Sequence, residues 1–190
     1  MPYQYVPGIN SVLDMELFDV VTMPSGTTIV GTYNFFGHTQ GANGANVTNL
    51  QTANQLPQNW NYMEVKGFTM QFLSQANSIA DIISLMQAGY YTFSVAQQPM
   101  KFGPISEFTN LVAITQDTAL ISSSTVDTVA IHPHTSHVGC YIPLEEGFSI
   151  TIPSQFNFSF TLQLTANVAA LYSQKIKVGM KGVLSQKIVG

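Results

Sequence analysis

Residues 155–165 carry the clearest pattern of hydrophobic and polar positions in the chain. Every second residue is apolar and the residues between them are polar, which is typical of a strand with one dry face and one wet face. The apolar positions are Phe156, Phe158, Phe160, Leu162 and Leu164. The pattern predicts one long strand that lines a hydrophobic core.

Other segments are rich in the β-branched and aromatic residues that suit a pleated surface. We expect strands at 14–23, 27–36, 62–73, 90–97, 148–152 and 175–184, and further β-prone stretches at 108–115 and 118–131. Turn residues separate many of these segments, and Pro99 and Gly103-Pro104 are expected to bound a loop. Short strands without a repeated strand–helix alternation indicate an antiparallel all-β sandwich or barrel.

Residues 78–88 are the one segment with helical periodicity. Ile79, Ile82, Ile83 and Met86 follow the i, i+3, i+4, i+7 spacing of one apolar helix face. Ser78 can cap the start of this helix, and Gly89 can end it. We therefore expect one short helix whose apolar side packs on the core.

Two segments lack such patterns. Residues 37–61 have no periodicity and predict a long loop, which in a compact domain is usually functional or disordered. Pro2, Pro7 and Gly8 interrupt regular structure near the start of the chain. We therefore expect residues 1–13 to form an extended N-terminal arm and residues 14–190 to form a single domain, as a chain of 190 residues allows.

Charged residues are scarce. Only 8% of the residues are Asp, Glu, Lys or Arg, and there is no arginine, whereas a soluble domain has about 25% charged residues. Gln, Asn, Ser and Thr supply 61 neutral polar residues instead. Interface cores are depleted in Lys, Glu and Asp, so this composition suits a protein whose faces are covered by neighbours. The alternative is an ordinary β-domain with a surface rich in Ser and Thr.

The C-terminal end is locally basic. Residues 175–190 hold four lysines and no acidic residue, whereas residues 1–174 hold ten acidic residues and two lysines. This end could face phosphate groups of nucleic acid or lipid; the alternative that we favour is lysines that protect an edge strand from stray pairing. Without arginine there is no bidentate contact to guanine, so we expect no sequence-specific nucleic-acid binding.

The only cluster of ligand-type residues contains His132, His134 and His137. Three imidazoles in six residues could bind a transition metal, and the His-x-His spacing is similar to that of cupins. The match fails further on, because cupins place a glutamate about four residues after the second histidine, and here Glu145 and Glu146 come 11 and 12 residues after it. In an extended segment, moreover, His137 would not share a face with the other two. We assign no metal site.

Other candidate residues have simpler explanations. Cys140 is the single cysteine, so no intramolecular disulfide can form, and nothing around it resembles a nucleophile motif. Glu145 and Glu146 are adjacent and suit a solvated turn, and Asp14, Glu16 and Asp19 lack the pattern of a calcium loop. Trp60 could stack on a sugar or plug one end of the domain. We assign no catalytic or cofactor-binding residue, and the sequence contains neither a secretory signal nor an 18-residue apolar run.

The order of these parts resembles the single jelly-roll major capsid proteins of icosahedral bacteriophages, including those with an internal membrane. The parts are the arm at 1–13, the strands, the helix at 78–88 and the long loop at 37–61. The segments PLEEGFSITIPSQFNFSFTLQL and QKIKVGMKGVLSQKIVG look like the late strands of such proteins. The resemblance implies an antiparallel jelly-roll sandwich of about eight strands with one short helix.

The resemblance also implies a function. The chain would be a structural virion protein, made in the host cytoplasm, whose copies assemble into an icosahedral shell without a cofactor or an enzymatic activity. Its partners would be copies of itself, other capsid proteins and, through the basic C-terminal end, internal membrane lipid or genome. Two alternatives remain open at this point: a carbohydrate- or receptor-binding jelly roll of a fibre or spike, and a cupin-like metal-binding protein.

Overall fold

A computed structural model describes residues 5–6, 10–24, 26–40, 47–73, 85–111, 116–123, 126–133, 140–170 and 174–186. Most of these residues form strands; the others include loops, a short helical stretch at 85–87 and a 3-10 helix, η1, at Ile105–Leu111. The first strands are β1 (Tyr5–Val6), β2 (Asn10–Met23), β3 (Gly26–Phe35), β4 (Trp60–Phe72), β5 (Gly89–Val95) and β6 (Gln98–Pro104). After η1 come β7 (Gln116–Ser123), β8 (Val126–Pro133), β9 (Cys140–Pro143), β10 (Ile150–Pro153), β11 (Phe158–Ala170) and β12 (Gln174–Gln186).

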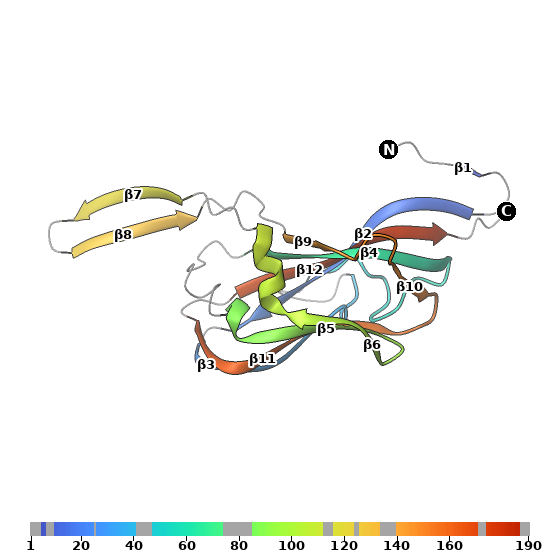
Figure 1. The fold of residues 1–190 in the computed structure, drawn as a ribbon, viewed down its shortest axis with the longest axis horizontal. Helices are drawn as coiled ribbons and strands as arrows, with labels where there is room; N and C mark the ends of the chain where they lie inside the picture. Colours follow the sequence, from blue (N-terminus) through green and yellow to red (C-terminus); the bar gives the residue numbers. More distant parts are fainter. Residues whose placement is uncertain are drawn as a thin grey trace.

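Two antiparallel sheets lie one above the other (Figure 1). The first sheet has the order β1-β2-β12-β4-β10, with β9 also paired to β4, and the second has the order β3-β11-β5-β6. Apart from the hairpin β7–β8, successive strands along the chain from β2 to β12 cross from one sheet to the other, except at the hairpin β5–β6 and between β9 and β10. This winding is the jelly roll, so the predicted fold class is confirmed.

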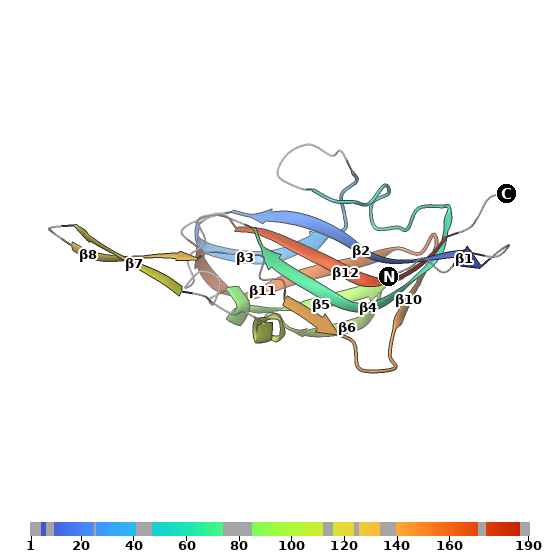
Figure 2. The same cartoon turned by 90° about the horizontal axis from the view of Figure 1, so that it is seen from above.

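The hairpin β7–β8 belongs to neither sheet. Its two strands pair with each other from Gln116↔Pro133 to Ser123↔Val126, and they form a separate two-stranded sheet. The hairpin projects beyond one end of the sandwich (Figures 1 and 2). It is inserted between η1 and β9, where the sequence predicted a β-prone stretch at 118–131.

Strand β12 is central in the first sheet, paired to β2 from Gln174↔Met23 to Gln186↔Ser11 on one side and to β4 on the other. Its alternation places Ile176, Val178, Met180 and Leu184 in the core. Close packing requires a glycine at 182, because a Cβ there would meet the backbone carbonyl of Glu64 in β4. A full-length partner on each side is the reason that the C-terminal strand is longer than the expected 175–184.

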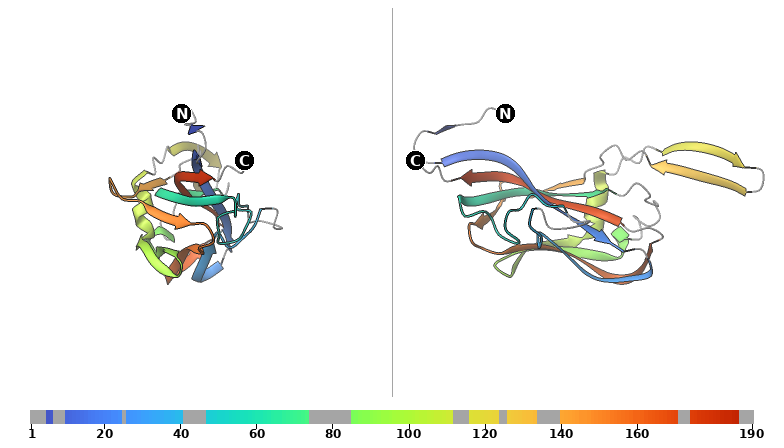
Figure 3. Two further views of the ribbon diagram at one scale, coloured as in Figure 1. Left: turned by 90° about the vertical axis from the view of Figure 1, so that its right-hand side faces the viewer. Right: turned by 180° about the vertical axis from the view of Figure 1, so that it is seen from behind.

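The core is formed by the facing sides of the two sheets, and aromatic rings fill its centre. Phe160 of β11 is fully buried and stacks on Tyr91 of β5 with ring centroids 5.4 Å apart. The η1 helix lies across the open side between the sheets (Figures 1 and 3), where it inserts the buried Ile105 and Phe108. Offset and edge-to-face ring pairs of this kind add stability beyond the buried area.

Some sequence predictions were wrong in detail. Residues 105–111 form η1, not part of a strand at 108–115; this segment closes the side of the sandwich, where its backbone has no sheet to join. Residues 98–104 form β6 in spite of Pro99 and Gly103-Pro104, because prolines are tolerated in a strand at the edge of a sheet. β11 starts at Phe158, so Phe156 lies in the preceding turn and is 48% exposed.

Other predictions were confirmed or extended. Strands at 27–36, 62–73 and 90–97 correspond to β3, β4 and β5 within a few residues. β2 starts at Asn10, four residues before the expected strand, because β12 pairs with it down to Ser11. Residues 85–87 are helical and Gly89 begins β5, as expected for the end of the helix, whose beginning lies outside the described residues.

Candidate functional site

The outer face of the second sheet is uncharged. β3, β5 and β11 contain no charged residue, and β6 contains only Lys101, which pairs with the buried Phe93 and so lies on the core side. We call the outward residues the neutral face: Thr32, Asn34, Tyr90, Thr92, Ser94, Phe102, Ser159, Thr161, Gln163 and Thr165. Hydroxyl, amide and aromatic side chains, without an ion, make this surface suited to contact with another uncharged surface.

The most exposed large hydrophobic side chain of the described residues is on this face. Phe102 is 72% exposed, and its register partner Thr92 points outward between the buried Tyr91 and Phe93. Tyr90, which is 39% exposed, donates a hydrogen bond from its hydroxyl to Oε1 of Gln163 at 2.6 Å. Aromatic residues are enriched in protein interfaces and charged residues are depleted there, and the neutral face has both features.

The outer face of the first sheet has the opposite character. It carries outward charged residues on three neighbouring strands, which we call the charged face: Asp14, Glu16, Glu64, Lys175, Lys177 and Lys181. The three lysines were expected on an edge strand, and that prediction was wrong, because β12 lies between β2 and β4. Lys177 and Lys181 therefore have Glu16 as an acidic neighbour, and Lys187 lies outside the described residues.

Glu16 connects three strands on the charged face. Its Oε1 accepts a hydrogen bond from the Thr69 hydroxyl at 2.7 Å and lies 3.4 Å from the Lys177 ammonium. The side chain of Glu16 crosses β12 at Gly179, where a Cβ would meet both Glu16 and Thr69. Lys177 also lies over the ring of Phe18, 4.7 Å from its centroid, so this lysine has partners within its own chain.

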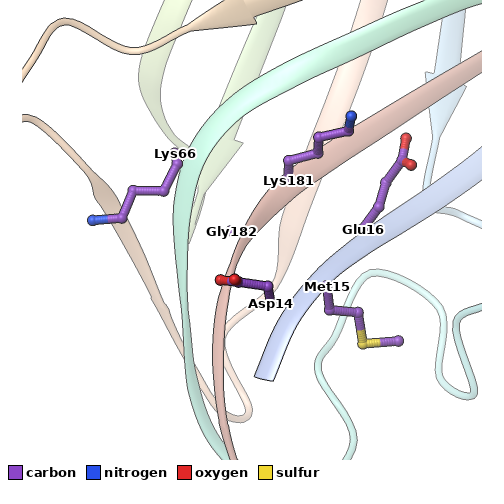
Figure 4. A pocket seen from close by; sticks show the side chains of 6 residues that line it. All are labelled: Asp14, Met15, Glu16, Lys66, Lys181 and Gly182. Carbon is purple, nitrogen blue, oxygen red and sulfur yellow. The ribbon is translucent and has the colours of Figure 1, made fainter. Parts of the chain in front are cut away.

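A shallow depression of about 370 Å³ lies on the same face (Figure 4). Its lining residues are Asp14, Met15, Glu16, Lys66, Lys181 and Gly182. Lys66 pairs with Glu64, and its hydrogen bond, followed by one from Ser149, lowers the pKa of the Glu64 carboxyl. Lys181 lies 5.5 Å from the ring centroid of Tyr141. The mixture of acidic and basic groups makes the depression a weak match for any single ion.

One carboxylate is buried completely. Asp19, with no exposed surface, accepts a hydrogen bond from the Phe36 backbone N–H at 2.6 Å and lies 3.1 Å from Nδ1 of His38. Both partners belong to the segment that leaves β3. Buried polar groups are retained where they are hydrogen-bonded, and these bonds of Asp19 tie the start of the long loop to β2.

The far part of that loop lies along the edge of β2. The backbone N–H of Val20 donates to the carbonyl of Val47, and the N–H of Asn49 donates to the carbonyl of Phe18. The Asn49 side chain also accepts from the Phe18 N–H at 2.8 Å. Residues 47–50 therefore cover this edge at Phe18–Val20, which gives the predicted loop a structural role.

Tyr91 is a buried tyrosine with a raised pKa. Burial raises its pKa well above the ordinary value of 10, and its hydrogen bond to Glu107 of η1 acts in the same direction. The hydroxyl donates to Oε2 of Glu107 at 2.7 Å. This hydrogen bond joins η1 to the aromatic core, and we assign it a structural role.

The histidine cluster is only partly placed. His132 lies on β8, paired in register with Asp117, whereas His134 and His137 lie outside the described residues. Within the described residues, no group of three His, Cys, Asp or Glu side chains could hold a metal ion. The structure therefore does not bring the three histidines together as a site or separate them.

The remaining candidates are dispersed. Trp60 is the first residue of β4 and packs partly buried against the core, so its ring helps to fill the sandwich. Glu145 and Glu146 are exposed in the turn before β10, as expected. Asp14, Glu16 and Asp19 do not converge, because Asp19 points into the core side of β2 and the other two point outward. Cys140 starts β9.

The sequence analysis did not predict the neutral face, although two features of it are visible in the sequence. Period-2 alternation marked the polar side of 155–165, and the absence of charge in three strands is visible in the sequence. Only the pairing of β3, β11, β5 and β6 shows that these uncharged segments are neighbours.

None of the helices described here is long and apolar enough to span a membrane.

Comparison with known proteins gives no relative. No family model, no curated protein and no solved structure matches this chain.

Proposed function

We propose that this chain is a capsid subunit, a structural virion protein that assembles into a closed icosahedral shell. The neutral face is the observation that carries the proposal. A jelly-roll domain that stays alone in water gains solubility from charges on its surface, and this one concentrates its outward charges on one sheet while the other sheet has none. A surface of this kind is suited to being covered by another copy.

The size of the neutral face supports many weak contacts rather than one strong contact. Four strands spaced ~4.8 Å apart and about seven residues long give a face of roughly 19 by 23 Å, or about 440 Å². A standard interface buries about 800 Å² on each partner. One such face is therefore too small to hold a stable pair by itself, whereas a closed shell combines several contacts per subunit.

The placement of the other candidates is consistent with a structural role. Two acidic side chains of the charged face pair with lysines of the same chain, Glu16 with Lys177 and Glu64 with Lys66. Trp60, on which a sugar-binding role would depend, packs against the core. In the proposed shell the partners are copies of the same chain and other capsid proteins. The lysines of β12 are the candidate contacts to lipid or genome, and the neighbouring Glu16 reduces the positive charge that they present.

A charge placed on the neutral face tests the proposal. Phe102→Glu puts an unpaired carboxylate into the proposed contact, whereas Phe148→Glu changes a loop residue that is 68% exposed and serves as the matched control. We expect Phe102→Glu to shift the concentration for assembly upward at least about tenfold, equivalent to ~1.4 kcal/mol, with the control unchanged. If both variants assemble at the same concentration in analytical ultracentrifugation, the neutral face is not the contact between copies.

A further inference from the structure

Several strand edges of the described structure are protected. Residues 47–50 cover β2 at Phe18–Val20, and β6 has prolines at 99 and 104 together with a register shift opposite Phe93 and Ser94. β9 and β10 have four residues each, and each ends at a proline. Short strands, prolines, bulges and covering segments are the usual devices that prevent pairing with a foreign strand.

Strand β3 has fewer of these protective devices: its pairing with β11 has two register shifts, one of them between Gly26 and Ile29 of β3. It has ten residues, without a proline or a charged residue, and it pairs only with β11. Within the described residues, no backbone group lies in a hydrogen bond along its other edge, from Gly26 to Asn34. Val30 on this strand is 54% exposed. An uncharged edge that none of the described residues covers is a template for an added strand.

Among the described residues, the hairpin β7–β8 lacks a third strand, which an edge such as that of β3 can supply. Its two strands of eight residues pair with each other and with no strand of either sheet in the described structure. An isolated two-stranded hairpin is at best marginally stable in water, and a third strand supplies what it lacks. The hairpin contains only two charged residues, Asp117 and Asp127, so little charge opposes its pairing with β3.

We propose that the hairpin β7–β8 of one copy adds to the free edge of β3 in a second copy, so that the four-stranded sheet continues into the neighbour. The strand lengths match, eight residues against ten. Pairing within one chain is disfavoured, because the hairpin lies beyond the end of the sandwich and not alongside β3 in any view (Figures 1, 2 and 3). The contact is head-to-tail, and head-to-tail contacts close into rings when the rotation between copies closes. This inference rests on the proposed self-assembly and names one of its contacts.

Complementation between two defective subunits tests the inference. The first variant, Val30→Lys, places a lysine on the β3 edge and keeps the hairpin; the second replaces residues 116–133 by a Gly/Ser linker and keeps the edge. The matched control is Met100→Lys, which changes a 48% exposed residue on the protected edge strand β6. Circular dichroism verifies that each variant keeps its β-sheet content.

We expect each defective variant to require at least about tenfold more protein for assembly than wild type, with Met100→Lys unchanged. Mixed at a concentration where neither variant associates alone, the two are expected to form a 1:1 complex, because one supplies a hairpin and the other supplies an edge. If wild type assembles and the hairpin deletion assembles equally well, or the mixture forms no complex, this inference is overturned and the capsid proposal stands. If the wild-type chain itself stays a monomer, both are overturned.

Discussion

Replacing Phe160 by alanine measures how much the aromatic core stabilises the sandwich. Phe160 has no exposed surface and contacts rings from four other segments of the core. These rings are Tyr91, Phe68, Phe35 and Phe108, with centroids at 5.4, 5.7, 6.1 and 6.4 Å. Truncation of a buried phenylalanine removes these contacts and leaves a cavity, at a cost of about 3–5 kcal/mol in the free energy of unfolding.

The control for this variant is Phe156→Ala. The sequence pattern places Phe156 and Phe160 on one face, whereas in the structure Phe156 lies in a turn and is 48% exposed. Since burying a whole phenylalanine is worth about 1.5–3 kcal/mol, truncating a half-buried one costs roughly 1 kcal/mol. The two variants are therefore expected to differ by at least about 2 kcal/mol.

Urea unfolding of the dissociated subunit, followed by circular dichroism, is the assay. With an m-value of about 2 kcal/mol per molar urea, Phe160→Ala lowers the midpoint by roughly 1.5–2.5 M, and Phe156→Ala by roughly 0.5 M. Equal shifts would refute the placement of Phe156 in the turn. A shift of less than about 0.5 M for Phe160→Ala would refute the central role of that ring.

Three further predictions concern the backbone and one titrating group. Gly182→Ala should destabilise the domain by at least about 2 kcal/mol in urea unfolding, because its Cβ would meet a backbone carbonyl of β4. Ala96→Asn with Gln97→Gly should stabilise it by about 1 kcal/mol, since both residues have positive φ, 51° and 67°, in the β5–β6 turn. Above pH 10 the unfolded chain loses the Tyr91 proton while the folded chain keeps it, so stability should fall by up to about 1.4 kcal/mol per pH unit, and less in Tyr91→Phe.

Controls and contrary results differ among these three. Gly37→Ala, where nothing lies within 4 Å of the added Cβ, should be nearly neutral beside Gly182→Ala, and equal losses would contradict the close packing of β12 on β4. A destabilised turn variant would mean that residues 96 and 97 do not adopt positive φ. For Tyr91, identical pH dependence of wild type and Tyr91→Phe between pH 9 and 11 would contradict its burial.

Much of the fold was predictable because strands with one dry face leave a periodic signal. Residues 27–36, 62–73 and 90–97 became β3, β4 and β5, and the helical residues 85–87 end just before Gly89, the residue expected to end the helix. What failed depended on contacts remote in sequence. η1 has no periodic signal that separates it from a strand, and its position depends on the open side of the sandwich that Ile105 and Phe108 fill.

The candidate surface was predictable only in its composition. The scarcity of charge indicated covered faces, but which faces depends on strand order, because β3 and β11 are far apart in sequence and adjacent in the sheet. The lysines of the C-terminal strand show the same limit. They were expected at an edge, yet β12 is central, since it pairs with both β2 and β4. Pairing between distant strands carries no local sequence signal.

Particle size is the most direct test of the proposed function. The purified full chain, measured by light scattering and negative-stain electron microscopy at rising concentration, is expected to form closed shells, flat lattices or stable multi-subunit capsomers. A strict monomer or a small dimer under all conditions of salt, pH and concentration would contradict the capsid proposal.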